Sequence, residues 1–335
     1  EETQMIRVAI NGFGRIGRLA FRRIITTTDF DIIAINDLGN SSDLAYLAKY
    51  DTTHRSFHED LIEAQEDYIV VNKVKKIKVY NETDPSNLPW KELNIDLVIE
   101  CTGKFTKYDD AHKHIEAGAK KVIISAPSKS DNVKTVVFGV NDSILEGTED
   151  IVSAASCTTN CLAPIAKVLN DNIGIINGYM STIHAYTNDQ VTLDVAHKKG
   201  IASRRGRACA ANIVPTSTGA ASAIGKVIPE LNGLLEGGAY RVPVTDGSLV
   251  ELTFIPKRAT SIDEINHLFE ENTSDTLKIT YDPIVSSDII GKPYGALVDG
   301  MLTSINGNLV KVTAWYDNEY GYTCQMLRTA KAMFK

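Results

Sequence analysis

The fold of the first half of this chain is decided by the stretch Val8-Ala9-Ile10-Asn11-Gly12-Phe13-Gly14-Arg15-Ile16-Gly17-Arg18. An apolar strand runs into the pattern G-x-G-x-x-G, and an amphipathic helix follows it. A second apolar strand, residues 32–35, ends at Asn36-Asp37 and so places a carboxylate where it can bind an adenosine ribose. This order of strand, glycines, helix, strand and acid predicts a βαβ unit that binds a dinucleotide.

The expected cofactor contacts follow from that layout. The glycines let the backbone turn tightly and approach a pyrophosphate, whose charge the helix N-terminus stabilises. Two later apolar strands are each closed by a hydroxyl residue. The residues expected at the cofactor are Gly12, Gly14, Arg15, Ile16, Gly17, Asp37, Thr102 and Ser125.

A second informative stretch is Ala155-Ser156-Cys157-Thr158-Thr159-Asn160-Cys161, which lies between a short strand at 151–154 and a run with helical spacing. Ser156 is suited to act as N-cap, which places the Cys157 thiol in the first turn, where free N–H groups and the helix dipole favour an anion. This position predicts a lowered thiol pKa and a nucleophilic thiolate. The alternative is an inert cysteine buried in a small-residue turn.

His184 is the candidate base for this thiol. It ends a strand that contains Thr182 and Ile183. A lone histidine is more often structural than catalytic. A cysteine nucleophile in a dinucleotide-binding chain nevertheless needs a nearby base, and imidazole is the side chain best matched to neutral pH.

Five motifs, in order along the chain, resemble the glyceraldehyde-3-phosphate dehydrogenase family. They are Asn11-Gly-Phe-Gly-Arg-Ile-Gly-Arg18, Ser156-Cys-Thr-Thr-Asn-Cys161, His184-Ala-Tyr-Thr-Asn-Asp189, Pro215-Thr-Ser-Thr-Gly-Ala-Ala221 and Trp315-Tyr-Asp-Asn-Glu-Tyr-Gly-Tyr322. The resemblance extends from about Ile6 to the C-terminus and is bacterial in character.

The expected fold is α/β, a Rossmann-type doubly wound parallel sheet plus an α+β catalytic domain with a largely antiparallel sheet. We expect an NAD-binding domain at 1–155 and a catalytic domain at 156–317, and the resemblance implies that a C-terminal helix, 318–335, packs back on the first domain. The expected strands of the first domain are 7–11, 32–36, 97–100, 121–125 and 136–139, with an antiparallel pair within 68–80. Helices are expected at 15–26, 44–49 and 109–117.

The combination of a thiolate, a base and a dinucleotide site implies oxidation of an aldehyde through a covalent thioester. Cys157 would attack the carbonyl of glyceraldehyde 3-phosphate to give a thiohemiacetal, and His184 would take the hydroxyl proton while a hydride leaves for NAD. Inorganic phosphate would then attack the thioester and release 1,3-bisphosphoglycerate. The resemblance places this reaction in glycolysis and gluconeogenesis.

The resemblance also assigns the remaining ligand contacts. It implies that Thr187 and Arg241 hold the phosphate of the substrate, Arg241 as a bidentate fork. It implies that Asn318 fixes the nicotinamide carboxamide and that Tyr322 packs near that ring. For the attacking inorganic phosphate it implies Ser156, Thr158, Thr218 and Gly219.

One departure from the family bears on the cofactor. Relatives that prefer NAD often carry Leu-Pro in the loop beyond His184, where this chain has Val195-Ala196. Asp37 should still repel a 2′-phosphate, so NAD remains the expected cofactor.

The loop that contains Val195-Ala196, residues 185–207, is long and polar, and the resemblance implies that it packs on a partner within a homotetramer.

The alternatives belong to three classes. An erythrose-4-phosphate dehydrogenase would share the fold and nucleophile and release a free acid. A catalytically silent binding protein would have no use for Cys157, His184 and Arg241 together. A cysteine hydrolase would not need the dinucleotide motif.

Composition restricts the partners and the compartment. The net charge of −7 and the absence of a long basic run argue against nucleic acid. Cys157 and Cys161 lack a second pair or a histidine cluster, so no metal is expected. Five scattered cysteines, no visible signal peptide and no bilayer-length apolar run predict a reduced, cytoplasmic protein that does not bind membranes.

Overall fold

The computed structural model describes residues 4–335, which form two compact units. The first comprises the chain up to Val136 with Asp142–Ala155 and Met326–Lys335. The second comprises Val137–Asn141 and Ser156–Gln325. Residues 1–3 of the expected first domain lie outside the described part of the chain.

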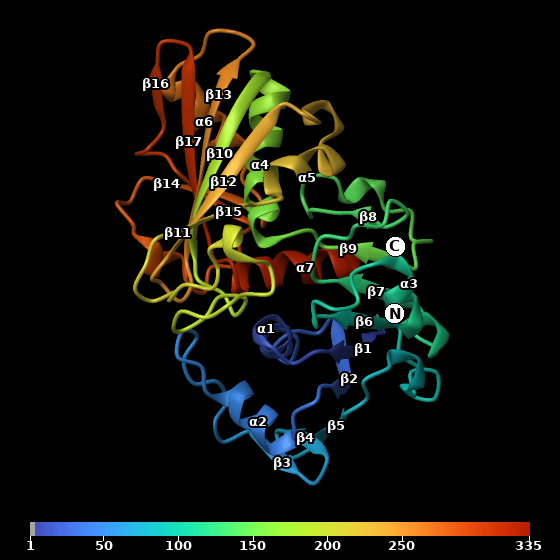
Figure 1. Ribbon diagram of the computed structural model, residues 1–335. Helices are drawn as coiled ribbons and strands as arrows, with labels where there is room; N and C mark the ends of the chain where they lie inside the picture. The colour runs from blue at the N-terminus through green and yellow to red at the C-terminus, as the bar shows by residue number, and fades with distance from the viewer. Residues whose placement is uncertain (1–3) are drawn as a thin grey trace. The chain divides into compact units, whose positions relative to one another are not determined.

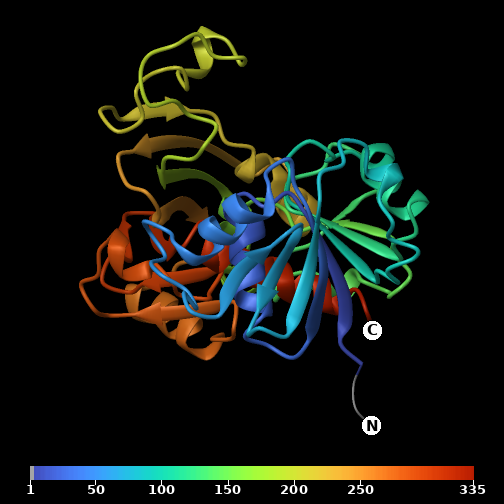
Figure 2. The ribbon, with the colours of Figure 1, turned by 90° about the horizontal axis from the view of Figure 1, so that it is seen from below.

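Within residues 4–335, the first unit is built on a nine-stranded sheet of order β3-β4-β5-β2-β1-β6-β7-β9-β8, whose blue-to-green strands fan out in Figure 2. Its strands are β1 (Ile6–Asn11), β2 (Phe30–Asn36), β3 (Ile62–Gln65), β4 (Tyr68–Val71), β5 (Lys75–Tyr80), β6 (Leu97–Glu100), β7 (Lys121–Ile124), β8 (Lys134–Thr135) and β9 (Ile151–Ser153). Neighbouring strands pair in parallel, except that β3–β4 and β4–β5 are antiparallel. The predicted parallel sheet and its antiparallel insertion are therefore confirmed.

Helices cover both faces of this sheet. Helices α1 (Arg15–Ile24) and α2 (Ser41–Lys49) lie on one face, and α3 (Tyr108–Glu116) lies on the other (Figures 1 and 2). A strand that is covered on both sides has no polar face, and Val8, Ala9 and Ile10 of β1 are indeed fully buried. Because β1 pairs with β2 on one side and β6 on the other, the chain reverses its winding direction at β1, where doubly wound sheets bind ligands.

The expected strand at 136–139 is wrong. The strand in this region is the shorter β8, and the chain turns immediately after it. The side chain of Asn141 accepts from the Val137 N–H, and Gly139 has a φ of +81°. A residue in the left-handed region cannot continue a strand, so these apolar residues form a turn.

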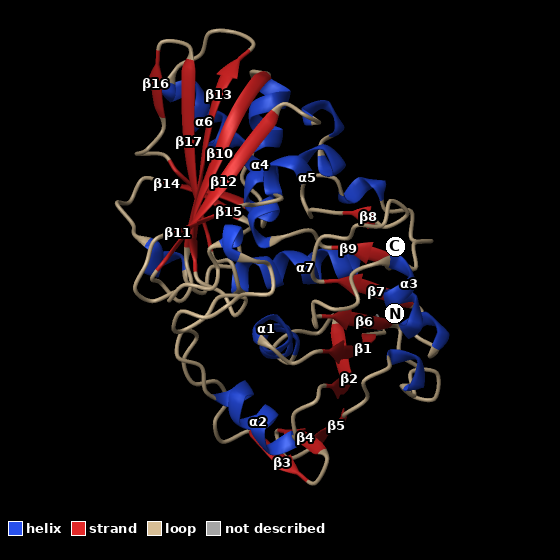
Figure 3. Cartoon of the chain, in the orientation of Figure 1, coloured by secondary structure: helices blue, strands red, loops and turns tan. Residues whose placement is uncertain are grey.

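Among the described residues, the second unit contains an eight-stranded sheet, drawn in red in the upper part of Figure 3. Its strands are β10 (Ile175–Ala185), β11 (Val214–Thr216), β12 (Leu235–Val242), β13 (Ser248–Pro256), β14 (Leu277–Thr280), β15 (Ala296–Asp299), β16 (Ser304–Asn306) and β17 (Leu309–Tyr316). Only the pairs β10–β12 and β14–β15 are parallel among its strand pairs in the described chain. The predicted largely antiparallel sheet is confirmed.

Helix α4 (Cys157–Asn172) packs on β10, β13, β15 and β17, and α5 (Ala220–Val227) and α6 (Ile262–Glu271) pack against α4. Ser261 is the N-cap of α6, and its hydroxyl accepts from the Glu264 N–H at 3.1 Å. Helix α7 (Tyr320–Ala332) begins in the second unit and ends in the first. Short 3₁₀ turns complete the chain at Pro85–Asn87, Asp142–Ile144, Ile201–Ser203, Pro229–Leu231 and Ser286–Ile289. Over residues 4–335 we find no helix with the length and apolar character that crossing a bilayer requires.

Candidate active site

Cys157 is the first residue of the 16-residue helix α4. The hydroxyl of Ser156 accepts from the Thr159 N–H at 3.0 Å, so the predicted N-cap is confirmed. The capped turn fixes the direction in which the helix leaves β9 and holds the thiol beside the unpaired N–H groups of the first turn.

His184 meets this thiol from the end of β10. Alternation along the strand buries Met180, Thr182 and His184 on one face, the face that packs on α4. The imidazole Nε2 lies 3.5 Å from the Cys157 sulfur. Its Nδ1 lies 2.7 Å from the carbonyl of Ala185, which can only accept, so the ring proton is on Nδ1. Nε2 therefore faces the sulfur as an acceptor.

The expected lowering of the Cys157 pKa is wrong in this structure. Burial raises the pKa of the thiol, against the opposing effects of the Arg241 guanidinium and the Thr158 hydrogen bonds. Burial and the same guanidinium lower the pKa of His184 to about 3. The ligand-free pair is thus a neutral thiol beside a neutral imidazole, and the base is ready to accept the thiol proton.

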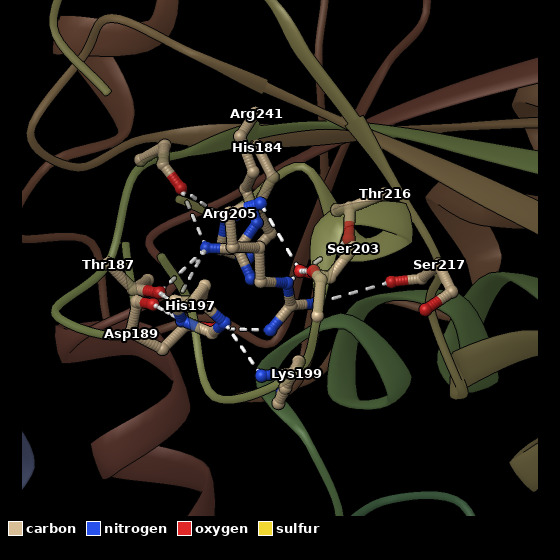
Figure 4. A network of polar contacts seen from close by, with 12 residues as sticks. His184, Thr187, Asp189, His197, Lys199, Ser203, Arg205, Thr216, Ser217 and Arg241 are labelled. Atoms are coloured by element: carbon tan, nitrogen blue, oxygen red, sulfur yellow. Dashed lines mark hydrogen bonds and ion pairs between the residues drawn. The ribbon is translucent and has the colours of Figure 1, made fainter. Parts of the chain in front are cut away.

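A cluster of polar side chains around Arg241 adjoins the imidazole (Figure 4). In the parallel pair β10–β12, His184 is in register with Arg241, so the two side chains come from neighbouring positions. Arg241 donates through Nη1 to Thr187 Oγ1 at 2.7 Å and to the Ala185 carbonyl at 3.2 Å. Its Nε is buried without a hydrogen-bond partner in the described chain. A buried N–H that lacks a partner marks a place for a ligand acceptor.

Two polar residues of the loop after β10 were not predicted from the sequence. Arg205 forms an ion pair with Asp189, which also accepts from Thr187, and its Nε donates to Thr216 Oγ1 at 3.1 Å (Figure 4). The Gln190 side-chain amide is buried, and neither of its polar atoms has a partner among the described residues. The only sequence signal for either was position: Gln190 follows the His184 motif, and Arg205 belongs to the short basic run Arg204-Arg205-Gly206-Arg207.

The other residues expected at an anion lie at two helix N-termini. Gly219 is the N-cap of α5, and a Cβ atom at this position would meet open space. Thr218 precedes it and accepts from the Ala220 N–H at 3.2 Å. Thr158 lies in the first turn of α4, where its hydroxyl contacts Tyr316 at 2.9 Å. Both termini offer backbone N–H groups that favour anions.

The first unit contains a cavity of about 330 Å³ at the carboxyl ends of β1, β2 and β6. It is lined by Asn11, Gly12, Gly14, Asn36, Asp37, Leu38, Glu82, Thr83, Cys101, Thr102, Lys104 and Phe105. A Cβ atom at Gly17 would lie 2.1 Å from the Gly12 carbonyl, whereas at Gly14 it would enter open space. Gly17 therefore allows α1 to pack close to the glycine turn, and Gly14 leaves the helix N-terminus open to a pyrophosphate.

The predicted ribose carboxylate lies at this cavity and is held by two backbone donors. Asp37 accepts from the Phe13 N–H at 2.7 Å and from the Gly39 N–H at 2.9 Å. Thr102 is at the cavity wall, while Ser125 follows β7 and is not among the lining residues of the described chain. Arg15 and Ile16 begin α1, and Arg15 pairs with Asp51.

The two residues expected at the nicotinamide belong to the second unit. Asn318 is buried, and its Oδ1 accepts from the Gly247 N–H at 3.1 Å and from Ser248 Oγ at 2.8 Å. These donors orient the amide so that Nδ2 remains the group for a ligand carbonyl. Tyr322 is buried in the first turn of α7.

Comparisons with known proteins agree with this geometry. A family model for the NAD binding domain of glyceraldehyde 3-phosphate dehydrogenase matches residues 6–108, and one for the C-terminal domain matches residues 156–318. The glyceraldehyde-3-phosphate dehydrogenase of Clostridium acetobutylicum is 54% identical over 329 residues, which cover 97% of each chain. Those of Clostridium pasteurianum and Streptococcus pyogenes are 53% and 52% identical, with 99% of each chain covered.

Proposed function

The chain belongs to the glyceraldehyde-3-phosphate dehydrogenase family, and we propose that Cys157 and His184 perform its chemistry. The enzyme oxidises glyceraldehyde 3-phosphate with NAD as cofactor, a reaction of glycolysis. The observation that carries the proposal is the 3.5 Å contact between the Cys157 sulfur and an unprotonated His184 Nε2. A thiol needs this arrangement to become a nucleophile at the moment of attack.

The proposed reaction uses the pair twice. His184 Nε2 takes the thiol proton as the Cys157 sulfur bonds to the aldehyde carbon, and the resulting oxyanion is stabilised by the N–H groups at the start of α4. The protonated His184 returns this proton to the oxyanion, which gives the thiohemiacetal hydroxyl. His184 Nε2 then takes the hydroxyl proton again as the hydride departs, which leaves a thioester on Cys157. Bound NAD supplies the ring that accepts this hydride. The thioester conserves the energy of oxidation for transfer to phosphate.

The polar cluster around Arg241 supports a phosphorylating reaction. Arg241 and Thr187 are proposed to hold the substrate phosphate, supported by the unpaired Arg241 Nε. Ser156, Thr158, Thr218 and Gly219 are proposed to receive inorganic phosphate, which attacks the thioester carbon and releases the Cys157 sulfur with an acyl phosphate as product. The open N-termini of α4 and α5 support this second site.

For the cofactor, the first unit is the proposed NAD-binding domain. The glycine turn, the open N-terminus at Gly14 and the carboxylate of Asp37 fit the adenosine and pyrophosphate of NAD. Thr102 and Ser125 are proposed at the adjoining strand ends. The second unit is the proposed catalytic domain, in which Asn318 offers Nδ2 to the nicotinamide carbonyl and Tyr322 packs near the ring.

A homotetramer is the proposed assembly. The loop after β10 exposes apolar side chains, with Ile201 98% exposed and Leu193 74% exposed. Side chains of this kind are normally covered in a stable protein, and closed symmetry is the usual way to cover them with a second copy. Light scattering at micromolar concentration should report about four times 36.6 kDa, and a fully active monomer would refute the assembly.

The proposed location is the cytoplasm. The reaction requires a free Cys157 thiol, and the reducing conditions of the cytoplasm keep thiols free.

One assay separates the proposal from its rivals. Glyceraldehyde 3-phosphate should support NADH formation that depends on phosphate or arsenate. The relatives favour this activity over oxidation of erythrose 4-phosphate. The rival would be favoured if erythrose 4-phosphate were oxidised without phosphate and faster than glyceraldehyde 3-phosphate. A non-catalytic binding protein would give no NADH with either aldehyde.

A further inference from the structure

Three fully buried side chains lie behind the cofactor cavity of the first unit. Glu100 ends β6, His114 lies on α3, and Trp90 precedes that strand in the chain. Their exposed fractions are 2%, 0% and 0%, and none is among the cavity-lining residues of the described chain. They belong to neither the glycine motif nor the catalytic pair. A buried carboxylate is costly unless every acceptor position is used, so its surroundings should show what it does.

Glu100 accepts four hydrogen bonds, and residues of the cavity wall donate three of them. Its Oε2 accepts from the N–H of Thr102 at 2.9 Å and from the Thr102 hydroxyl at 2.7 Å. Its Oε1 accepts from Asn11 Nδ2 and from His114 Nε2, the latter at 3.0 Å. The carboxylate therefore joins the end of β1 to the turn after β6, and both border the cavity.

The donors at the two ends of this network fix the direction of every bond in it. The Trp90 indole can only donate, and it donates to His114 Nδ1 at 3.0 Å. The proton of the imidazole is therefore on Nε2, from which it is donated to Glu100. At the other end, the Glu82 N–H donates to Asn36 Oδ1 at 2.9 Å, and Asn36 Nδ2 donates to Asn11 Oδ1 at 2.7 Å.

Two chains of donors thus converge on the Glu100 carboxylate, one from Trp90 and the other from the Glu82 N–H. Together they connect four residues that line the cavity. These are Asn11, Asn36, Glu82 and Thr102. A second contact reaches the same wall, because the Phe105 ring packs edge-on against the His114 ring with centroids 6.4 Å apart. Asn11 Nδ2 and His114 Nε2 lie 3.3 Å apart because both donate to Glu100 Oε1. At the other contacts, reversal of one amide or of the imidazole tautomer would place two donors or two acceptors face to face.

We propose that His114, Trp90 and Glu100 are positioning residues for the cofactor, which hold Asn11 and Thr102 in the arrangement that binds the adenosine half of the dinucleotide. This rests on the proposed function of the cavity as the NAD site. His114 is the central member of the three, because its Nδ1 accepts a hydrogen bond from the Trp90 indole and its Nε2 donates one to the Glu100 carboxylate. Its role is exerted through Glu100, at a distance from the ligand.

The test compares two substitutions at His114 with a control substitution, His112→Leu, on the same helix α3. His114→Leu removes both hydrogen bonds and should weaken binding of NAD and of ADP-ribose about tenfold, the scale of one or two lost hydrogen bonds. His114→Gln can still donate to Glu100 and should recover part of the loss. His112→Leu changes a partly exposed side chain paired with Glu116 and should bind both ligands as the wild type does.

Steady-state kinetics should show the same selectivity. The KM for NAD should rise in His114→Leu, whereas the KM for glyceraldehyde 3-phosphate should stay within about twofold, the spread expected for independent sites. A general loss of folded protein would lower the rate without this split. Combining His114→Leu with Thr102→Ala should weaken ADP-ribose binding by less than the product of the two single effects, since both act through Glu100.

Should His114→Leu fail to fold, Trp90→Phe is the second variant. It removes only the donor that fixes the tautomer and should weaken ADP-ribose binding about threefold, a smaller loss in the same direction. Folded His114→Leu or Trp90→Phe protein with wild-type affinity for ADP-ribose would overturn the positioning role. Failure of the wild type itself to bind ADP-ribose and NAD would instead refute the proposed function of the cavity.

Discussion

The proposed dinucleotide site and the proposed catalytic pair of this chain are assembled in opposite ways. The first follows from one continuous strand, turn and helix, in which Gly12, Gly14 and Gly17 act through the backbone. The second brings the start of α4 to the end of β10, and the register of β10 with β12 adds Arg241 beside His184. Local geometry determines the first site, and strand register determines the second.

This difference predicts how the two sites respond to substitution. In the dinucleotide site many weak contacts contribute to the binding free energy of the cofactor, so a single substitution should change the affinity by a modest factor. In the catalytic pair each side chain has one role that no neighbour can take over. Substitutions there should produce much larger losses and leave NAD binding in place.

The largest expected effect belongs to Cys157→Ser. Turnover of glyceraldehyde 3-phosphate should fall by at least about 10⁴-fold, the scale of loss when a nucleophile is removed, because a hydroxyl ionises far less readily than a thiol. NAD affinity, measured by calorimetry, should be unchanged. Cys209→Ser is the matched control and should retain wild-type turnover. Near-normal turnover in Cys157→Ser would exclude the thioester mechanism.

His184→Ala should reduce the acylation rate by about 10²- to 10⁴-fold, the usual contribution of a general base. Without Nε2 the thiol loses its nearest proton acceptor, whereas burial still raises its pKa. Alkylation of Cys157 by iodoacetamide at pH 7 should therefore slow as well. Stopped-flow measurement of the NADH burst tests the first effect, and a burst of wild-type rate would contradict the assignment.

Arg241→Leu should act on both substrate binding and thiol reactivity. We expect kcat/KM for glyceraldehyde 3-phosphate to fall about 100-fold, since hydrogen bonds to charged groups contribute about 1.5–3 kcal/mol, and unphosphorylated glyceraldehyde to be much less affected. The guanidinium lowers the Cys157 pKa, so its removal should shift the pH profile of alkylation to higher pH. Arg241→Lys keeps the charge and should leave that profile near the wild-type position. Equal losses for both aldehydes would contradict the phosphate role.

The sequence predicted the dinucleotide unit well because its signals are local. The strand, glycine turn, helix and acid are close together in the chain, and the N-cap at Ser156 is equally local. The strand expected at 136–139 failed because apolar composition did not reveal the turn made by Gly139 and the Asn141 side chain.

Properties that depend on packing could not be predicted in the same way. The position at a helix N-terminus favoured a low Cys157 pKa, but burial outweighs it and raises the pKa. Arg205 joins the polar cluster around Arg241 through the folding of the loop after β10, and the same loop buries the Gln190 side chain. That loop has little regular structure to predict. Arg241 came from family resemblance alone, since register places it beside His184.

Asp37→Ala should change cofactor choice by a modest factor and also lower stability. Removing the charge should raise kcat/KM for NADP relative to NAD, and losing acceptors for two backbone N–H groups should cost about 1–3 kcal/mol of unfolding free energy. Asp37→Asn removes the charge but keeps one acceptor, so it separates the two effects. If the wild type already uses NADP as well as NAD, Val195-Ala196 rather than Asp37 dominates cofactor choice.

The smallest expected effect concerns Asp51, the partner of Arg15 in the glycine motif. Burial alone would raise the pKa of Asp51, but the hydrogen bonds from Arg15 and the His54 N–H outweigh it and lower the pKa to about 2. A carboxyl with a depressed folded-state pKa stabilises the protein above its unfolded value of 3.8, and this contribution is lost as the pH falls towards 2. Asp51→Asn should therefore lower the unfolding free energy by about 1–2 kcal/mol at pH 6, and the deficit should shrink at pH 3. His184 has the same dependence at higher pH: its folded-state pKa of about 3 lies below the usual 6.5, so the unfolded chain binds the proton first and stability falls as the pH drops from 6.5 towards 3. Urea unfolding of the wild type and Asp51→Asn at both pH values tests the prediction, and a deficit that stays constant would show that Asp51 does not stabilise the glycine turn through its charge.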